Sequence, residues 1–284
     1  LIPGFVDVHT HGCMGYDTCD GDLSGYDEMS KFYLSHGVTS FLFTTMTFSE
    51  DILSDIVAKL RLYIDYKKYP GATPKGIYLE GPFINPKKNG AQSEKYICDP
   101  DIKMFDRLQS IADGNIKVVL VAPEMNGGID FIRSASKKGV SVTVGHTSTN
   151  YNTACAAYDN GACDTTHLFN GMPSYHHREP GVIGAAFEKS RFVEMICDGV
   201  HVHPSVIRNT FKQVSANRVV LISDSVQAAG MPDGKYTLGG QEIELKNGKA
   251  LLTDGTIAGS AGNLSMCVKN CVLFGIKPED AIKA

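Results

Sequence analysis

The sequence of 284 residues lacks three features, each of which would define a class of protein. No apolar run approaches the roughly 18 residues that a membrane-spanning helix needs, so we expect no membrane partner. The formal net charge is −4, with 27 basic and 31 acidic residues, which argues against a nucleic-acid partner because such a surface is basic. The eight cysteines form no Cys-x-x-Cys pair. We therefore expect reduced, mostly buried thiols in a cytoplasmic protein without a signal peptide.

Eight short runs rich in β-branched and apolar residues alternate with longer helical stretches, which is the pattern of βα units around a parallel sheet. The runs span residues 5–11, 40–48, 75–83, 117–124, 140–148, 164–170, 192–202 and 218–225. Eight such units predict an α/β fold, a (β/α)8 TIM barrel. A doubly wound open sheet is the alternative, and it is disfavoured because no G-x-G-x-x-G follows the first run. After the eighth run, short alternating strands with Gly-Gly and Asn-Gly turns predict an antiparallel excursion.

Ionisable side chains lie at the ends of these runs, where barrel enzymes hold their chemistry. His9 and His11 are two residues apart, so both imidazoles face one side of the first strand. Burying such groups beside Val, Leu and Ile costs free energy unless a metal or hydrogen bonds compensate. For this pair alone, the simpler interpretation is two core histidines whose nitrogens are hydrogen-bonded within the protein. The ends of later runs carry Glu80, His146, His167, Asp198, His201 and Asp224.

Six of these side chains form a candidate metal centre: His9, His11, Glu80, His146, His167 and Asp224. Nitrogen and carboxylate ligands without thiolate favour a divalent metal, Zn²⁺ or Fe²⁺, with Mn²⁺ or Co²⁺ as alternatives. Six ligands exceed what one tetrahedral ion with an open position needs, so we expect one or two ions per chain.

A second group of residues has the chemistry of an anion site. Asn170, Gly171 and Arg178 lie on the loop after the sixth run, and His201 follows the seventh. An arginine beside backbone NH groups and a histidine can hold a phosphate, although an arginine on such a loop can equally form a surface salt bridge. Gln92, on the long loop after the third run, can hydrogen-bond a substrate carbonyl or simply be solvated.

The segments PGFVDVHTHG, LEGPFINPKKNGAQ, VGHTS, HLFNGMPSYHHREPG, CDGVHVHP, LISDS and GTIAGS occur in this order. They closely resemble the N-acetylglucosamine-6-phosphate deacetylases of the amidohydrolase superfamily, over residues 3–264. The resemblance implies a metal-dependent hydrolase that converts N-acetylglucosamine 6-phosphate to glucosamine 6-phosphate and acetate in amino-sugar catabolism, and a homodimer. It also implies a catalytic barrel over residues 1–233, an antiparallel excursion near a small β-sandwich over 234–256, and a substrate loop with closing helices over 257–284.

The same resemblance assigns roles to individual residues. Glu80, His146 and His167 match the principal metal ligands, and Asp224 matches the catalytic acid/base. His9 and His11 match a pair that supports a second metal in some members of the family. Some members have His where this chain has Gln92. The substrate contacts implied by the matched motifs are Ala91, Gln92, Asn170, Gly171, Arg178, Asp198, Gly199, Val200, His201, Ile257, Ala258 and Gly259.

Two other functions fit parts of the pattern. Dihydroorotase-like enzymes hydrolyse cyclic amides, and many bridge two metals with a carboxylated lysine at the end of the fourth strand. Here Lys117 lies at the start of that run, and Glu80 offers the bridging carboxylate instead. The other alternative is a non-enzymatic scaffold, which we would expect to have lost some of the six ligands.

Overall fold

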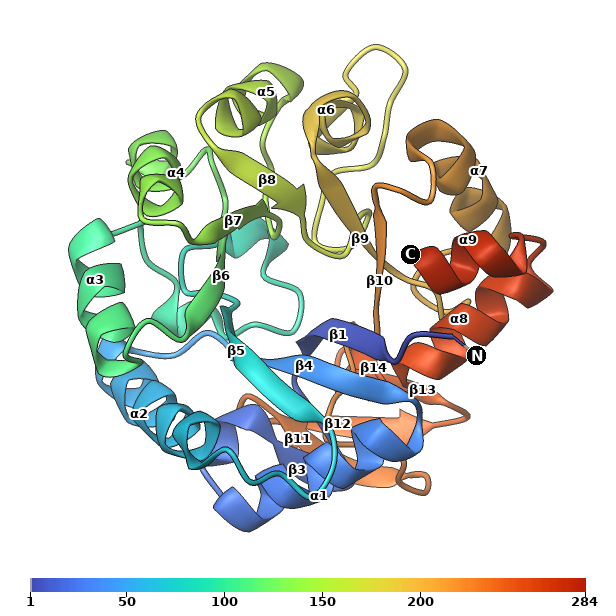
Figure 1. Ribbon diagram of the computed structural model, residues 1–284. Helices are drawn as coiled ribbons and strands as arrows, with labels where there is room; N and C mark the ends of the chain where they lie inside the picture. Colours follow the sequence, from blue (N-terminus) through green and yellow to red (C-terminus); the bar gives the residue numbers. More distant parts are fainter. Residues whose placement is uncertain (1) are drawn as a thin grey trace.

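Eight parallel strands arranged in a ring form the centre of the protein, and helices surround them (Figure 1). The computed structural model describes residues 2–284. Neighbouring strands pair in the order β1-β4-β5-β6-β7-β8-β9-β10, and β10 lies beside β1. The predicted (β/α)8 barrel is therefore confirmed. Its strands are β1 (Phe5–Thr10), β4 (Val38–Thr44), β5 (Thr73–Leu79), β6 (Ile116–Val121), β7 (Ser141–Val144), β8 (Ala162–Thr165), β9 (Phe192–Ile196) and β10 (Val219–Ile222).

The strands end earlier than the apolar runs predict, because the polar residues at the end of each run belong to the following loop. The seventh run, for example, extends to residue 202, whereas β9 ends at Ile196. The helices that cover the barrel are α1 (Leu23–Ser35), α2 (Glu50–Tyr66), α3 (Ile102–Ile111), α4 (Gly128–Lys137), α5 (Tyr151–Asp159), α6 (Gly181–Lys189), α7 (Pro204–Val214), α8 (Leu264–Leu273) and α9 (Pro278–Lys283). Short elements in the loops are β2 (Gly12–Cys13), β3 (Tyr16–Asp17), η1 (Thr18–Asp20), η2 (Pro86–Lys88) and η3 (Glu94–Tyr96).

Side chains alternate between the two faces of each barrel strand. On β4, Phe41 and Phe43 point outward into the main apolar core beneath the helices, whereas Leu42 points into the barrel. There it belongs to a small apolar cluster that includes Tyr78 and Leu120. The Tyr78 ring packs against the His9 imidazole at 4.6 Å between centroids, so this inner cluster forms the floor under the polar mouth.

An antiparallel sheet follows β10 and is attached to the barrel mouth. Its strands are β11 (Gly234–Leu238), β12 (Gln241–Lys246), β13 (Lys249–Leu252) and β14 (Ile257–Ser260). The backbone NH of Ser260 donates to the Asp224 carbonyl at 2.8 Å, and the NH of Val226 donates to the Ser260 carbonyl at 3.0 Å. Leu238 and Ile243 pack with Val226 in a separate apolar cluster. The sheet is thus held by backbone hydrogen bonds and apolar contacts directly beside Asp224.

Over residues 2–284, no helix is long and apolar enough to cross a membrane. All eight cysteines carry free thiols, and four of them, rather than most, are buried: Cys13, Cys197, Cys267 and Cys271.

Arg218 connects the end of α6 to the start of β10. Its guanidinium donates to the carbonyl oxygens of Ala186 and Phe187 at 2.9 Å each, and to that of Ser190 at 2.6 Å. These are carbonyl groups of the last turn and the C-cap of α6, of which only that of Ala186 also accepts a backbone NH, from Ser190 at 3.2 Å; a positive charge there also complements the helix dipole. Arg218 therefore anchors α6 against the strand that leads to Asp224.

We expect the substitution Arg218→Ala to lower the free energy of unfolding by about 2 kcal/mol, because it removes charge-assisted hydrogen bonds to these carbonyls. Urea unfolding followed by circular dichroism measures the change. The control is Arg191→Ala, since Arg191 is exposed and stacks on the Phe192 ring at 5.2 Å. That substitution should change stability by no more than about 0.5 kcal/mol. Equal losses in the two variants would contradict the capping role of Arg218.

Candidate metal centre and active site

Three of the candidate ligands lie two residues beyond a strand end, in a backbone conformation that side chains rarely adopt. His146, His167 and Asp224 follow β7, β8 and β10, with φ of 42°, 27° and 48°. This left-handed region costs a residue other than glycine roughly 1–3 kcal/mol, and such strain is concentrated at functional sites. The turns direct the three side chains into the barrel mouth instead of along the strands.

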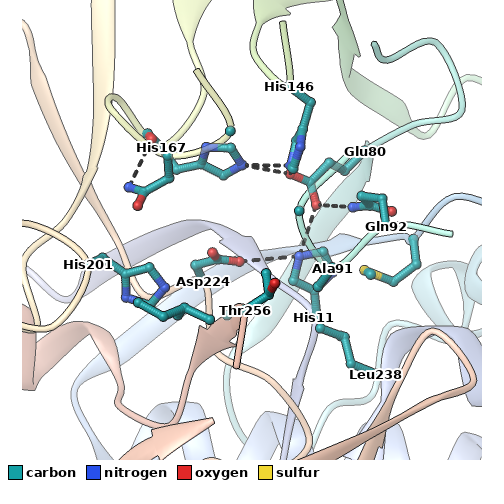
Figure 2. A pocket seen from close by; sticks show the side chains of 16 residues that line it. His11, Glu80, Ala91, Gln92, His146, His167, His201, Asp224, Leu238 and Thr256 are labelled. Carbon is teal, nitrogen blue, oxygen red and sulfur yellow. Dashed lines mark hydrogen bonds and ion pairs between the residues drawn. The ribbon is translucent and has the colours of Figure 1, made fainter. Parts of the chain in front are cut away.

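Glu80 lies at the centre of the mouth, directly after β5 (Figure 2). Its Oε1 is 3.1 Å from His167 Nε2, 3.4 Å from His146 Nε2 and 3.5 Å from His9 Nε2. Its Oε2 is 3.0 Å from His11 Nε2. One buried carboxylate therefore contacts four imidazoles that come from three different strand ends.

The six side chains form two groups on either side of this carboxylate. His9, His11 and Asp224 make one group, and Glu80, His146 and His167 make the other; within each group the ligand atoms lie within 4.8 Å of one another. Asp224 Oδ1 is 3.5 Å from His9 Nε2 and 3.3 Å from His11 Nε2. All six residues are buried. The structure thus brings together every residue of the predicted metal centre.

The chemistry of these atoms fits divalent cations. The Nε2 atom of His9 is buried and has no hydrogen-bond partner. The Nδ1 atom of His146 lies 2.6 Å from the Lys88 carbonyl oxygen and must donate to it, so Nε2 carries the lone pair. That Nε2 lies 3.1 Å from the Nε2 of His167, a close approach of two nitrogens that a shared cation would favour. Imidazole and carboxylate donors without thiolate are the ligands of a divalent metal centre.

The mutual contacts of this centre keep its carboxylates ionised. Burial alone would raise the pKa of Glu80, but the charge of His9 and the neighbouring imidazoles of His11, His146 and His167 outweigh it and hold the pKa well below its usual range. Burial likewise opposes ionisation of Asp224, but the hydrogen bond from His11 and the charge of His9 lower its pKa. Burial would lower the pKa of His11, but Asp224 and Glu80 raise it to about 9. Asp224 is therefore available as a proton acceptor.

A cavity of about 230 Å³ opens beside this centre and has two chemically different sides. Figure 2 shows His201 on one side of Asp224 and Gln92 on the other side of Glu80. Met46 and Leu238 add apolar groups to the lining. Seven of the predicted substrate contacts line the cavity: Ala91, Gln92, Asn170, Gly171, His201, Ile257 and Gly259.

The other predicted substrate contacts lie outside the cavity lining. Arg178 is exposed, and its guanidinium lies 2.8 Å from the His177 ring. Ala258 is buried in the apolar cluster of the antiparallel sheet. The remaining three are consecutive residues of the loop after β9: Asp198, Gly199 and Val200.

Gln92 is held from both ends of its amide group. Its Oε1 accepts the backbone NH of Thr47 at 2.7 Å, and its Nε2 donates to Glu80 Oε2 at 2.9 Å. The first bond fixes which end of the amide faces the carboxylate. One NH of Gln92 is therefore engaged in orienting Glu80, and the second is the group that remains for a ligand.

Asp198 acts on His201 instead of facing the cavity. Its Oδ1 accepts the backbone NH groups of Val200 and His201 at 2.8 and 2.9 Å. Its Oδ2 accepts from His201 Nδ1 at 2.7 Å and from the Ser260 hydroxyl at 3.3 Å. The carboxylate is thus fully engaged within the protein. It leaves Nε2 as the nitrogen of His201 that can meet a ligand.

One polar residue of this region was not predicted. Glu194 lies on β9 with its side chain inside the barrel, where its Oε2 is 3.1 Å from His9 Nδ1. The only signal in the sequence is an acidic residue within the apolar run FVEMIC, which the alternation of strand side chains places opposite to the core-facing Val193 and Met195.

The chain is similar to known proteins over nearly all of its length. The chain matches the Amidohydrolase family over residues 1–284. The N-acetylglucosamine-6-phosphate deacetylase of Bacillus subtilis (strain 168) is 40% identical over 263 residues, which cover 92% of this chain and 66% of the relative. The N-acetylgalactosamine-6-phosphate deacetylase of Escherichia coli O157:H7 is 37% identical over 286 residues, covering 99% of this chain and 75% of the relative.

Solved structures give the same result. An N-acetyl-D-glucosamine-6-phosphate deacetylase mutant from Mycobacterium smegmatis, in complex with N-acetyl-D-glucosamine-6-phosphate, has a TM-score of 0.94 at 33% identity and covers 99% of this chain and 74% of that chain. The Thermotoga maritima enzyme of the same name has a TM-score of 0.91 at 37% identity, covering 99% and 76%.

The chain therefore belongs to the amidohydrolase family, a class of hydrolases. Within this family it resembles the N-acetylglucosamine-6-phosphate deacetylases, which confirms the resemblance seen in its sequence motifs. The chain spans about two thirds of the length of the Bacillus subtilis relative.

The contact between Asp198 and His201 gives a testable titration. Burial lowers the pKa of His201, but the hydrogen bond and charge of Asp198 outweigh burial and raise it. We expect the pKa of His201 to fall in Asp198→Asn, as measured by NMR of the imidazole against pH. Because the folded-state pKa is raised, the stabilising contribution of His201 is full below the unfolded pKa of about 6.5 and is lost as pH rises through the folded value. The variant should therefore lose more stability at pH 6 than at high pH.

Ser260→Ala is the matched control for this titration, because among the four hydrogen bonds to Asp198 it removes only the longest, together with the bond from the Gly262 NH to Ser260. It should leave the pKa of His201 unchanged. An unchanged pKa in Asp198→Asn would show that this carboxylate does not control the imidazole.

Proposed function

We propose that the protein is a metal-dependent deacetylase that hydrolyses N-acetylglucosamine 6-phosphate to glucosamine 6-phosphate and acetate. The observation that carries this proposal is the convergence of four imidazoles and two carboxylates on one barrel mouth, beside a cavity whose other side holds His201. The names of the relatives and of the solved structures support the choice of substrate.

Two groups of side chains would hold the metal. Glu80, His146 and His167 fit one divalent cation, and His9 and His11 with Asp224 fit a second. We propose Zn²⁺ or Fe²⁺ in these sites, with Mn²⁺ or Co²⁺ as alternatives, because all the donors are nitrogen or oxygen. A bound cation supplies Lewis acidity, which polarises a carbonyl group and lowers the pKa of water toward about 7.

Asp224 is the proposed general base and acid. Amides resist hydrolysis because the nitrogen is a poor leaving group until it is protonated. The ionised carboxylate of Asp224 takes a proton from the attacking water and then delivers it to the departing nitrogen. The free NH of Gln92 donates to the oxygen on which negative charge develops. Met46 and Leu238 supply apolar groups to the same cavity, and the acetyl methyl group is proposed to lie against them.

The phosphate is proposed to lie on the side of His201. Asn170 and Gly171 also line the cavity, and Arg178 follows them on the same loop as a further proposed contact. Ile257 and Gly259 of β14 line the cavity from the antiparallel sheet. Binding energy from the phosphate can be used to position the amide group for attack. The resemblance to the family also supports a homodimer located in the cytoplasm, with residues 234–256 near a small β-sandwich.

The first test is acetate release. Wild-type protein loaded with a divalent metal should release acetate from N-acetylglucosamine 6-phosphate, and Asp224→Asn should lower kcat by about 10²- to 10⁴-fold because proton transfer is lost. Metal analysis should still find an ion on Glu80, His146 and His167 in this variant. The control Asp55→Asn removes an exposed carboxylate of α2 and should not alter kcat. Near-normal turnover in Asp224→Asn would exclude its role in proton transfer.

The second test compares substrates. Arg178→Ala should raise KM for the phosphorylated sugar by about 10- to 100-fold, which corresponds to a charge-assisted hydrogen bond of about 1.5–3 kcal/mol. It should not change the weak hydrolysis of unphosphorylated N-acetylglucosamine. Lys87→Ala, which removes an exposed loop charge, is the control. If the wild type has equal kcat/KM for both sugars, the phosphate assignment is wrong.

The same substrate panel separates the alternatives. It includes N-acetylgalactosamine 6-phosphate, because the Escherichia coli relative carries that name. It also includes dihydroorotate, since ring opening without acetate release would identify a cyclic-amide hydrolase.

A further inference from the structure

A buried carboxylate that the proposed reaction does not use lies directly behind the candidate metal ligands. Glu194 is 1% exposed and projects from β9 into the barrel, on the side of His9 away from the cavity. Burial of an ionisable group at this depth is costly unless hydrogen bonds compensate. The role of Glu194 is therefore to be inferred from its hydrogen bonds.

The strongest contact is with the His9 side chain. Glu194 Oε2 lies 3.1 Å from His9 Nδ1. An ionised carboxylate can only accept hydrogen bonds, so Nδ1 carries a proton, and in the neutral imidazole Nε2 then keeps the lone pair. That Nε2 has no hydrogen-bond partner and lies 3.5 Å both from Glu80 Oε1 and from Asp224 Oδ1. Glu194 thus holds His9 in the tautomer in which Nε2 can bind a cation.

Glu194 also contacts the second group of ligands through the backbone. Its Oε2 accepts the backbone NH of His167 at 3.4 Å, and its own carbonyl accepts the NH of Leu168 at 2.8 Å. On the adjacent strand β8, burial and the neighbouring charge of Glu194 hold the pKa of Asp164 well above its usual range. Glu194 thus accepts hydrogen bonds from the backbone of the segment that carries His167 as well as from the His9 ring.

We infer that Glu194 is a positioning residue of the candidate metal centre, which fixes the tautomer of His9 and so determines the affinity of the His9, His11 and Asp224 group for a cation. The inference rests on the proposed metal-dependent function, but it concerns metal binding alone. Hydrogen bonds from a carboxylate to the second nitrogen of a metal-binding histidine typically change metal affinity by 10- to 100-fold. Glu194→Gln is nearly isosteric, and its amide NH₂ can donate to Nδ1 and so favour the opposite tautomer.

Two measurements without substrate test this inference. Zinc titration against a chelator, on the whole chain after metal removal, gives the affinity of each ion. Glu194→Gln should weaken the binding of one ion by about 10- to 100-fold and leave the ion on Glu80, His146 and His167 unchanged. The surface control Glu188→Gln removes one exposed carboxylate and should change neither affinity. Affinities within twofold of the wild type in folded Glu194→Gln would overturn the inference.

A double-mutant cycle with His9 distinguishes positioning from a general structural effect. If Glu194 acts through His9, then Glu194→Gln should cause no further loss of zinc affinity in a His9→Ala background. Additive losses would show that Glu194 acts elsewhere.

The tautomer itself is measured by ¹⁵N NMR of histidine-labelled protein loaded with zinc, because a bound cation displaces the proton that would otherwise compete for Nε2. Wild-type His9 should carry its proton on Nδ1, and this measurement stands even if Glu194→Gln does not fold. A proton on Nε2 of wild-type His9 would overturn the inference. The deacetylase proposal fails separately, if metal-loaded wild type releases no acetate while these binding results hold.

Discussion

The Glu80 carboxylate is shared by four imidazoles and one amide inside the barrel mouth, and the arrangement of the site depends on how that crowding is resolved. If all the imidazole nitrogens that face this carboxylate carried protons, positive charge would be left uncompensated in a buried space. If none of them did, their lone pairs would have no partner there. A divalent cation satisfies carboxylate and lone pairs together. Ligands must be deprotonated to bind metal, so protons and metal ions compete for the same atoms. The raised pKa of His11 describes the site with protons and without a metal ion.

The fold connects the two sides of the cavity through a short chain of hydrogen bonds. Asp224 accepts the backbone NH of Ser260 through its carbonyl, and the Ser260 hydroxyl donates to Asp198, which in turn holds His201. The strand end that carries the proposed base therefore also anchors the antiparallel sheet and orients the proposed anion-binding imidazole. Because these bonds involve a loop, a strand end and an edge strand, the spacing between the amide side and the phosphate side is set by the barrel and not by a flexible segment.

Much of this arrangement follows from the sequence, because parallel strands end at one rim and the polar residues occur where the apolar runs end. The shared rim of parallel strands is enough to place His9 and His11 close to Glu80. Other features depend on contacts that are distant along the chain. Glu194 and His9 are 185 residues apart, and no local pattern relates them. Asp198 is predicted as a substrate contact, and its four hydrogen bonds, from a turn and from Ser260, have no counterpart in the local sequence pattern. The left-handed backbone of His146 has no signal in its residue type.

These features make the site costly to the folded protein. Three ligand residues occupy the left-handed region, at about 1–3 kcal/mol each, and several ionisable groups are buried together. The large apolar core between strands and helices offsets this cost. A ligand that binds only the folded state adds further stability, which grows with the logarithm of the ratio of ligand concentration to Kd. A cation held by these six side chains would therefore stabilise the strained turns that present them. Stability and the proposed hydrolysis would then be coupled through the same atoms. A residue such as Glu194, which does not line the cavity, would affect both by setting which nitrogen of a ligand is free.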